Sequence, residues 1–283
     1  MLNFKRVLWA LRKINMPIGR NDIVLDIGSG NNPHPRSDVL IDRLSGKEHR
    51  SGAPMLIDRA AVVGDALKLP FKDKAFDFVI ASHVLEHISD PDTFFREIQR
   101  VGKAGYIETP SFLYERLNPS VAHCLEIHTN GEELVIHKKS EPVTDKFMKD
   151  SGYLTKPTPW SELAHNDPSL FHVRYYWKDN IRYTITNPEV SCEWVDKIYD
   201  QSSSKDVTYS NQDERKGWRK FGIELMQRYF NHGRKKRLSE EEFYSLLVCP
   251  ECHGKLNKAE TNLVCSVCHS SYPTVPFVNF ENK

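Results

Sequence analysis

The sequence lacks an excess of charge of either sign, and it lacks any long apolar run. Its 283 residues carry 39 lysines and arginines against 38 aspartates and glutamates, a formal net charge of +1. This balance exerts no general attraction on nucleic acid, so charge does not support a nucleic-acid partner. No segment reaches the length of a membrane span, and basic residues interrupt the apolar runs of the first 17 positions, where a secretory signal would lie. We therefore expect a cytoplasmic protein without a membrane partner, and the sequence leaves its oligomeric state open.

Cysteine is scarce outside one short region near the C-terminus. Two of the six cysteines stand alone, and the other four form two CxxC pairs, Cys249 with Cys252 and Cys265 with Cys268. Twelve residues separate the pairs, which lets two turns meet across a hairpin and supply four thiolates to a tetrahedral zinc ion. A unit of about 40 residues buries little core, so bound metal would supply part of its folding energy.

Histidine follows each CxxC pair, at His253 and His269, as in covalent haem attachment. That alternative requires an exported protein, and we find no export signal. A redox role explains two matched pairs less well than one shared metal. The sequence therefore predicts a zinc ribbon over residues 241–283.

Short apolar segments alternate with turns and helices in the first 110 residues. They lie at 23–27, 39–41, 61–63, 76–81 and 105–107, and a helix is predicted from Pro91 to Val101. This alternation predicts an α/β fold with a Rossmann-like, mostly parallel sheet that is covered on both faces. A short amphipathic helix over residues 2–14 is expected to pack against it.

Antiparallel hairpins are predicted after residue 120. Asn130-Gly131 indicates a two-residue turn between 121–128 and 132–138, which would place Cys124 opposite His137. We interpret that pair as ordinary neighbours rather than as metal ligands. A second hairpin is predicted from 171–177 through a turn at 178–180 to 181–185. The proline-containing stretch 140–170 shows little periodicity and indicates an irregular insertion or lid.

The chain is predicted to divide into three parts. Residues 1–200 form the α/β domain with its insertion, residues 201–240 form a linker and a helix, and residues 241–283 form the ribbon. A stripe of Trp218, Phe221, Leu225 and Tyr229 predicts the helix, and Ser239 with Glu242 predicts a capping box before one more. The basic run 234–237 is interpreted as a solvated linker.

Polar and glycine residues follow each predicted strand where it ends. They are Asp26, Gly28, Ser29 and Gly30 after the first strand, Asp42 after the second, Asp65 and Ala66 after the third, and Ser82 and His83 after the fourth. Ligands of doubly wound sheets bind past the carboxyl ends of the strands, so these residues are expected to meet at one site. Position 33 is proline, which breaks the GxGxxG pattern and disfavours a pyridine dinucleotide.

The segments VLDIGSG, VLID, GDALKLPFKDKAFDFVIASHVLEH and GYIETPS together resemble the type-11 class I S-adenosylmethionine-dependent methyltransferases over residues 20–111. The resemblance implies that S-adenosylmethionine is the cofactor. It places Asp26, Gly28 and Gly30 at the methionine end, Asp42 at the ribose, and Asp65 and Ala66 at the adenine. Ser29, between the two glycines, is also predicted to bind the cofactor. Ser82 and His83 would border the sulfonium, whereas His87 would be structural.

Methyl transfer requires an aligned acceptor and, for a hydroxyl, a group that takes its proton. His83 and Glu108, which ends the fifth strand, are our predicted catalytic residues. No Asp/Asn-Pro-Pro-Tyr/Phe element follows the fourth strand, which disfavours nucleobase and glutamine-amide nitrogens. We therefore expect an oxygen of a small molecule or glycan precursor as the acceptor. A non-catalytic cofactor-binding scaffold is the alternative from a different class.

The C-terminal segments LLVCPECHGKL and LVCSVCHSSYPTVPFVNF resemble the small zinc-ribbon proteins that activate tRNA, rRNA and translation-factor methyltransferases. The resemblance implies a zinc ribbon that supports an enzyme and performs no chemistry of its own. We expect it to stabilise or activate the catalytic domain within the same chain. A tRNA or protein methyltransferase with a built-in activator is therefore a second candidate.

Overall fold

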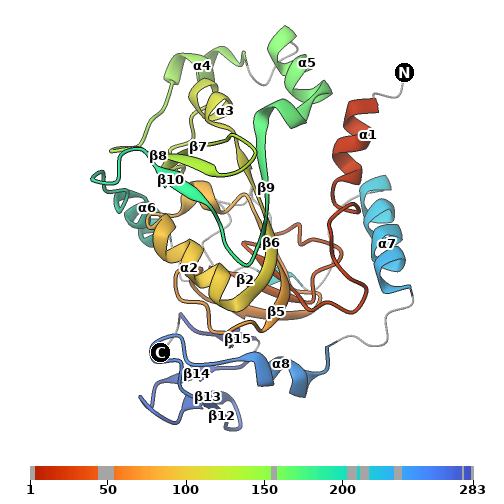
Figure 1. The fold of residues 1–283 in the computed structure, drawn as a ribbon, viewed down its shortest axis with the longest axis vertical. Coiled ribbons are helices and arrows are strands. Elements are labelled where there is room, and N and C mark those ends of the chain that lie inside the picture. The colour runs from red at the N-terminus through yellow and green to blue at the C-terminus, as the bar shows by residue number, and fades with distance from the viewer. Residues whose placement is uncertain are drawn as a thin grey trace.

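The computed structural model describes residues 4–43, 54–153, 158–202, 209–210, 217–232, 238–275 and 277–281. Within them, a central sheet of seven strands has the order β15-β4-β2-β1-β5-β6-β9 (Figure 1). The strands are β1 (Val24–Ile27), β2 (Val39–Asp42), β4 (Ala60–Val63), β5 (Phe76–Ser82), β6 (Gly102–Pro110), β9 (His172–Lys178) and β15 (Val278–Asn279). All neighbouring pairs are parallel except β6 and β9. The predicted mostly parallel α/β sheet is confirmed.

The central strands form because their apolar residues are buried on both faces of the sheet. Every residue of β1 is buried, including Asp26. Helix α2 (Pro91–Val101) begins where the Asp90 side chain accepts the Thr93 amide, and it buries Phe94, Phe95, Ile98 and Val101 at helical spacing. This helix contacts β6 and covers one face of the sheet.

Gly105 of β6 faces Trp177 of β9, and the indole of Trp177 occupies the space beside the glycine. A Cβ atom on Gly105 would lie 2.5 Å from the Val79 carbonyl oxygen and 2.6 Å from Trp177 Nε1. We expect Gly105→Ala to lower the free energy of unfolding by about 1–3 kcal/mol through overpacking. Denaturant unfolding measures this, with Gly222→Ala as the control, because no atom lies within 4 Å of a Cβ there. Equal stability of the two variants would contradict the packing argument.

The first predicted hairpin is present, but its loop is longer than predicted. Strand β7 (Leu125–Thr129) pairs antiparallel with β8 (Leu134–Lys138), and Thr129 faces Leu134 across a four-residue loop. The Asn130 side chain accepts the amides of Glu132 and Glu133 at 2.9 and 3.0 Å, which holds the wider loop.

The wider loop shifts the register of this hairpin by two residues. His137 therefore faces Glu126. The predicted juxtaposition of Cys124 and His137 is wrong, and the Cys124 carbonyl instead accepts the Lys139 amide at 2.8 Å.

The second predicted hairpin is wrong. Strand β9 pairs with β6, whereas β10 (Tyr183–Ile185) pairs in parallel with β8 in a separate sheet of order β10-β8-β7. The chain leaves β9 at residues 178–180, and the Ile181 amide then donates to the Gln99 side chain at 2.6 Å. The alternating buried residues Val173, Tyr175 and Trp177 make β9 an edge strand of the main sheet instead.

The stretch 140–170 is largely helical rather than irregular, with residues 154–157 outside the described part. It contains α4 (Lys146–Ser151), α5 (Pro159–Asn166) and the 3-10 helix η3 (Pro168–Phe171). Thr158 and Ser161 form a capping box at α5. The N-terminal helix α1 (Phe4–Leu11) contacts both α5 and η3, and Lys5 donates to Asp167 at 2.5 Å.

The remaining elements before the ribbon strands are β3 (Met55–Leu56), the 3-10 helix η2 (Leu85–His87), α3 (Phe112–Leu117), α6 (Trp194–Ser202), β11 (Tyr209–Ser210), α7 (Trp218–Asn231) and α8 (Glu240–Leu246). The predicted helix is therefore α7, and the capping box of Ser239 and Glu242 opens α8. Most of the predicted linker and the whole basic run 234–237 lie outside the described residues. None of the helices that the structure describes combines the length and apolar character needed to cross a bilayer.

The ribbon is attached to the preceding domain at both of its ends, to the loop between β4 and β5 at its start and to the central sheet at its end. Its strands β12 (Leu256–Lys258), β13 (Asn262–Cys265) and β14 (Ser271–Pro273) form an antiparallel sheet at one end of the molecule, and helices α4 and α5 lie at the other (Figure 1). At its start, the Val248 amide donates to the Pro70 carbonyl at 3.0 Å. At its end, β15 extends the central sheet beside β4, and the Phe280 amide donates to Val63 at 2.9 Å.

Candidate cofactor pocket and metal centre

Two neighbouring cavities lie at the carboxyl ends of the central strands. The first has a volume of about 210 Å³, and its lining includes the predicted residues Gly28, Gly30, Asp42, Asp65, Ala66 and His83. The second has a volume of about 440 Å³, and its lining includes the predicted residues Asp26, Gly28, Ser29, Gly30, Ser82, His83 and Glu108. The structure thus brings every predicted pocket residue to one end of the sheet.

The turn after β1 separates the two cavities and requires glycine. Gly28 and Gly30 have φ angles of +66° and +50°. A Cβ atom on Gly28 would lie 2.3 Å from a methyl group of Val84. The Asp42 carboxylate at the end of β2 accepts the Gly30 amide at 2.7 Å, so it fixes the turn while it also lines the cavity.

The donor set around this turn fits S-adenosylmethionine. The buried Ser29 hydroxyl has no hydrogen-bond partner in the described part of the chain, and it lies where the methionine end is expected. On the other side of the turn, Ile41, Leu67 and Val84 form an apolar lining beside the Asp42 and Asp65 carboxylates. An apolar slot with a few polar groups is typical of a nucleoside site.

Two of the predicted carboxylates also have local partners. Asp65 accepts the Leu67 amide at 2.8 Å and shapes its own turn. Asp26 accepts the His34 amide at 2.6 Å. Burial raises the pKa of Asp26 to about 6 although this bond opposes the shift.

His83 lies between two carboxylates at the junction of the two cavities. Its φ of +58° is uncommon for a residue other than glycine. Its Nδ1 lies 3.2 Å from Glu86 Oε1, and its Nε2 lies 3.8 Å from Glu108 Oε1. Burial favours the neutral imidazole, but the hydrogen bond and charge of Glu86 outweigh it and raise the pKa of His83.

Glu108 is held by partners that the sequence did not reveal. Arg12 Nε and Nη2 each donate to one of its oxygens at 2.7 Å, and the Tyr106 hydroxyl donates at 2.5 Å. Burial opposes ionisation of this carboxyl, but the Arg12 guanidinium and Tyr106 lower its pKa to about 2. Glu108 is therefore ionised, and both of its oxygens accept hydrogen bonds from Arg12 or Tyr106. This arrangement fits a residue that positions the acceptor better than one that removes its proton.

Sequence reasoning missed Arg12 and Tyr106, and it also missed Tyr199 of α6, which lines the first cavity. In the sequence, Arg12 is one of several basic residues in the short amphipathic segment 2–14. Its partner Glu108 lies 96 positions away, and no local pattern connects such residues. A basic residue at the end of a short amphipathic helix is the only local signal for Arg12, and it does not indicate which acidic residue Arg12 pairs with.

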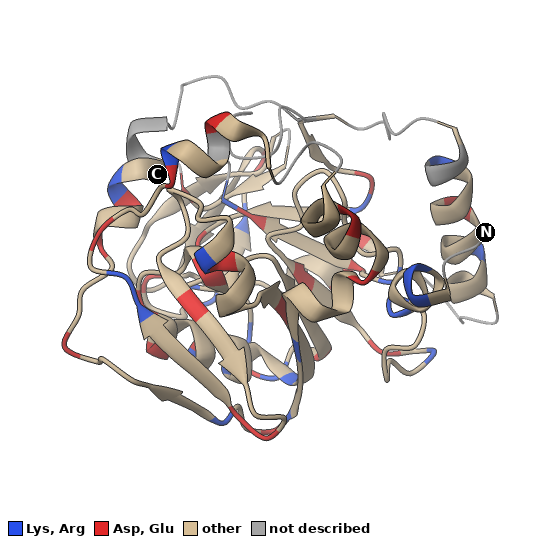
Figure 2. Cartoon of the chain, turned by 90° about the horizontal axis from the view of Figure 1, so that it is seen from above, with Lys and Arg blue, Asp and Glu red and all other residues tan. Residues whose placement is uncertain are grey.

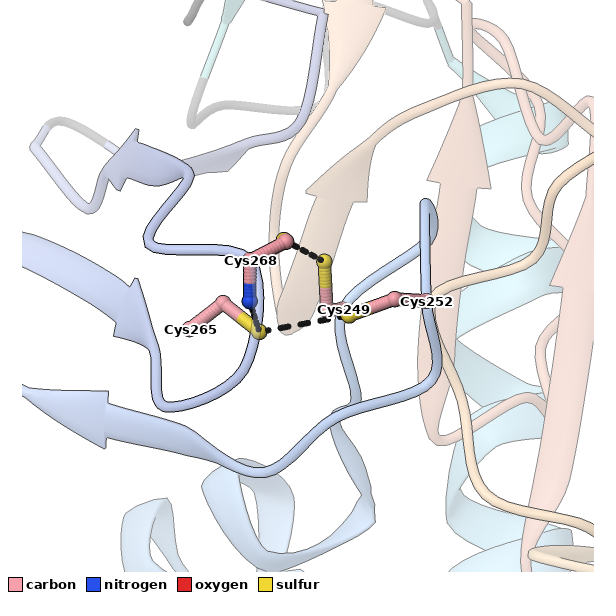
Figure 3. Close-up of side chains that lie close together, drawn as sticks. All are labelled: Cys249, Cys252, Cys265 and Cys268. Carbon is pink, nitrogen blue, oxygen red and sulfur yellow. Dashed lines mark hydrogen bonds between the residues drawn. The ribbon is translucent and has the colours of Figure 1, made fainter.

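The four predicted zinc ligands converge in the ribbon (Figure 3). The Sγ atoms of Cys249 and Cys268 lie 3.5 Å apart, and those of Cys252 and Cys265 lie 3.4 Å apart. Four thiolates at a Zn–S distance of about 2.3 Å in a tetrahedron would lie about 3.8 Å from one another. The cluster therefore fits a structural zinc ion if the Sγ atoms move apart by about 0.3–0.4 Å.

The backbone around the four-cysteine cluster forms two tight turns. Each CxxC pair is followed by a histidine with positive φ, 54° at His253 and 60° at His269, and both side chains are exposed. The amides of Val267 and Cys268 donate to Cys265 Sγ at 3.4 and 3.5 Å, as expected for a metal-binding thiolate. These histidines thus occupy the positive-φ positions of the two turns, and their placement does not support covalent haem attachment.

Comparisons with known proteins agree with both parts of the chain. A family model described as a methyltransferase domain matches residues 37–107, and one described as Trm112p-like protein matches residues 240–274. Ajmaline N-methyltransferase from Rauvolfia serpentina is 36% identical over 98 residues, which cover 34% of this chain and 32% of that protein. Demethylmenaquinone methyltransferase from Roseiflexus sp. (strain RS-1) is 46% identical over 44 residues, 16% of this chain and 18% of that protein. The chain thus spans about a third or less of the length of these relatives.

Two solved structures resemble parts of the fold. YcgJ from Bacillus subtilis covers 42% of this chain and 62% of its own, with 23% identity and a TM-score of 0.31. The complex of the Haloferax volcanii Trm112 methyltransferase activator with a methyltransferase covers 63% of this chain and 90% of its own, with 15% identity and a TM-score of 0.39. The two family matches and the converging cysteines show that this chain combines a class I S-adenosylmethionine-dependent methyltransferase domain with a C-terminal Trm112p-like domain suited to zinc.

Proposed function

We propose that this protein transfers a methyl group from S-adenosylmethionine to an oxygen of a small molecule or glycan precursor. The observation that carries the proposal is the convergence of Asp42, Asp65 and the Gly28–Gly30 turn at one end of the sheet, together with the Ser29 hydroxyl, which has no partner among the described residues. The proposal includes the division into a catalytic domain over 1–200 with an insertion at 140–170, a connection over 201–240 and a ribbon over 241–283.

The proposed roles follow from the two cavities. Asp42 accepts the ribose hydroxyls, and Asp65 with Ala66 borders the adenine in the first cavity. Asp26, Gly28, Ser29 and Gly30 surround the methionine end in the second cavity, while Ser82 and His83 border the sulfonium. His83 is the residue common to both cavities whose side chain can exchange a proton.

The sulfonium supplies the chemistry: an acceptor lone pair attacks the methyl carbon, the carbon–sulfur bond breaks, and its electron pair returns to sulfur. The protein aligns the acceptor and takes the proton of a hydroxyl. Glu86 accepts from Nδ1 of His83, which leaves Nε2 to receive that proton. The ion pair of Arg12 and Glu108 forms a charged wall beside His83 and positions the acceptor.

Binding of S-adenosylmethionine tests the pocket. Asp42→Ala is expected to weaken binding about 10- to 100-fold, because a charge-assisted hydrogen bond contributes about 1.5–3 kcal/mol. Titration calorimetry measures the affinity, and Asp73→Ala, at a side chain that is 75% exposed, is the control. Wild-type affinity in Asp42→Ala would contradict the pocket assignment. Formation of S-adenosylhomocysteine with candidate acceptors then separates an enzyme from a binding scaffold.

The match to ajmaline N-methyltransferase favours a second candidate, transfer to nitrogen. The site of methylation on the product distinguishes the two. A tRNA acceptor is less well supported, because acidic and basic residues are interspersed over the elements seen in Figure 2. Filter binding of bulk tRNA tests that candidate directly.

We further propose that the ribbon stabilises the catalytic domain within the same chain. Support comes from β15, which covers β4, and β4 leads directly into Gly64 and Asp65 of the first cavity. Without β15, β4 would be an edge strand with unpaired backbone groups. The ribbon would thereby hold in place the strand that carries the predicted adenine contact.

A further inference from the structure

Three side chains form a compact cluster beside the cofactor cavity that the proposed function does not explain. They are Glu86 and His87 of η2 and His123, which precedes β7, and one ligand atom from each lies within 4.8 Å of the other two. His87 is part of the lining of the first cavity, and the two imidazole rings meet nearly edge to face with centroids 4.6 Å apart. Imidazole and carboxylate groups in this number are typical ligands of divalent transition metals.

Both imidazoles use Nδ1 for contacts that fix their orientation. His87 Nδ1 donates to the Ala122 carbonyl at 2.8 Å, and the Tyr199 hydroxyl oxygen lies 2.6 Å from the same nitrogen. His123 Nδ1 donates to Glu115 Oε2 at 2.5 Å. Within the described residues neither Nε2 has a hydrogen-bond partner, so Nε2 is the nitrogen that each ring offers to a ligand.

The residues that hydrogen-bond to the cluster resemble those that orient the ligands of a metal site. A metal-bound histidine usually donates its other N–H to a carbonyl or a carboxylate, and here one ring does each. Glu115 is held by the buried Lys139 ammonium at 2.6 Å. Glu86 accepts from the Thr109 hydroxyl at 2.9 Å and from His83, which leaves acceptor positions on its two oxygens unused.

We propose that Glu86, His87 and His123 bind a divalent transition-metal ion, such as Zn²⁺ or Mn²⁺, at the wall of the cofactor cavity. Three protein ligands leave coordination positions open, as in catalytic sites and unlike the closed four-cysteine cluster. The role of the ion rests on the proposed function: it would bind an acceptor oxygen beside His83 and lower the pKa of its hydroxyl. An oxygen acceptor is therefore favoured over an amine.

Binding of Mn²⁺ alone tests the site, because Mn²⁺ prefers nitrogen and oxygen ligands and does not displace zinc from thiolates. The full chain, stripped by a mild chelator to one zinc ion per molecule, is titrated with Mn²⁺ while electron paramagnetic resonance follows the free ion. We expect one Mn²⁺ to bind per chain. The affinity should fall at least about tenfold in His123→Ala and in the more conservative Glu86→Gln.

The control is His128→Ala, an exposed histidine on β7 outside the cluster, which should bind Mn²⁺ as the wild type does. Circular dichroism shows which variants are folded. If His123→Ala is not folded, the Mn²⁺ affinity of Glu86→Gln decides the test. Absence of Mn²⁺ binding by the wild type, or wild-type affinity in Glu86→Gln, overturns the site. Calorimetry with S-adenosylmethionine on the same samples separates the proposals: cofactor binding without Mn²⁺ binding refutes only the metal site, and the reverse result refutes only the cofactor pocket.

Discussion

Cys265→Ser is expected to unfold the ribbon and to destabilise the whole chain. Cys265 ends β13 at the centre of the ribbon, and its thiolate faces Cys252 at 3.4 Å. Structural zinc in small domains supplies an apparent binding free energy of about 10–16 kcal/mol, which the few buried residues of this unit cannot replace. Because β15 is the last strand of the ribbon unit and completes the central sheet, loss of the ribbon fold would also uncover β4.

Zinc content, thermal unfolding and S-adenosylmethionine affinity measured on the same variant check this prediction. We expect loss of the ribbon zinc, a lower unfolding temperature and weaker cofactor binding. The control is His253→Asn, which changes the residue after the first CxxC pair but keeps a side chain that tolerates positive φ. An unfolded ribbon with undiminished cofactor affinity would refute the proposed stabilisation within the chain, while full zinc retention in Cys265→Ser would refute the cluster itself.

The parts of the fold that the sequence predicted depend on neighbouring residues. The strands β1, β2, β4, β5 and β6 contain short apolar runs, and glycine or a carboxylate marks the ends of β1, β2 and β4. The convergence of those ends follows from the rule that parallel strands share a carboxyl edge. The four cysteines are likewise fixed by spacing, because each pair needs only one tight turn.

The parts that the sequence could not predict depend on contacts between distant residues. The loop at Asn130 widened because its side chain bonds two amides, which moved the register of the hairpin. Strand β9 pairs with β6 instead of with β10, the next strand in the sequence. Strand β15 pairs with β4, which lies more than 200 positions away. His123 reaches η2 by the same kind of contact, so no local signal reveals that cluster.

Glu115→Ala is expected to lower the free energy of unfolding by about 3–5 kcal/mol. The Glu115 carboxylate and the Lys139 ammonium, 2.6 Å apart, are both buried, with side chains only 2% and 6% exposed. The removal of one partner leaves the other charge buried without compensation, which costs about 3–5 kcal/mol. No other carboxylate pairs with Lys139 in the part of the chain that the structure describes.

Denaturant unfolding measures this loss as a lower midpoint at unchanged slope. Glu126→Ala is the matched control, because its partner Arg116 is 61% exposed and such surface pairs contribute only about 0–1 kcal/mol. The combined change Glu115→Leu with Lys139→Met should recover most of the stability, since it leaves no buried charge.

If Glu115→Ala costs no more than Glu126→Ala, the buried pair does not stabilise this fold. Recovered stability without recovered Mn²⁺ affinity in the double variant would show that Glu115 serves His123 as well as Lys139.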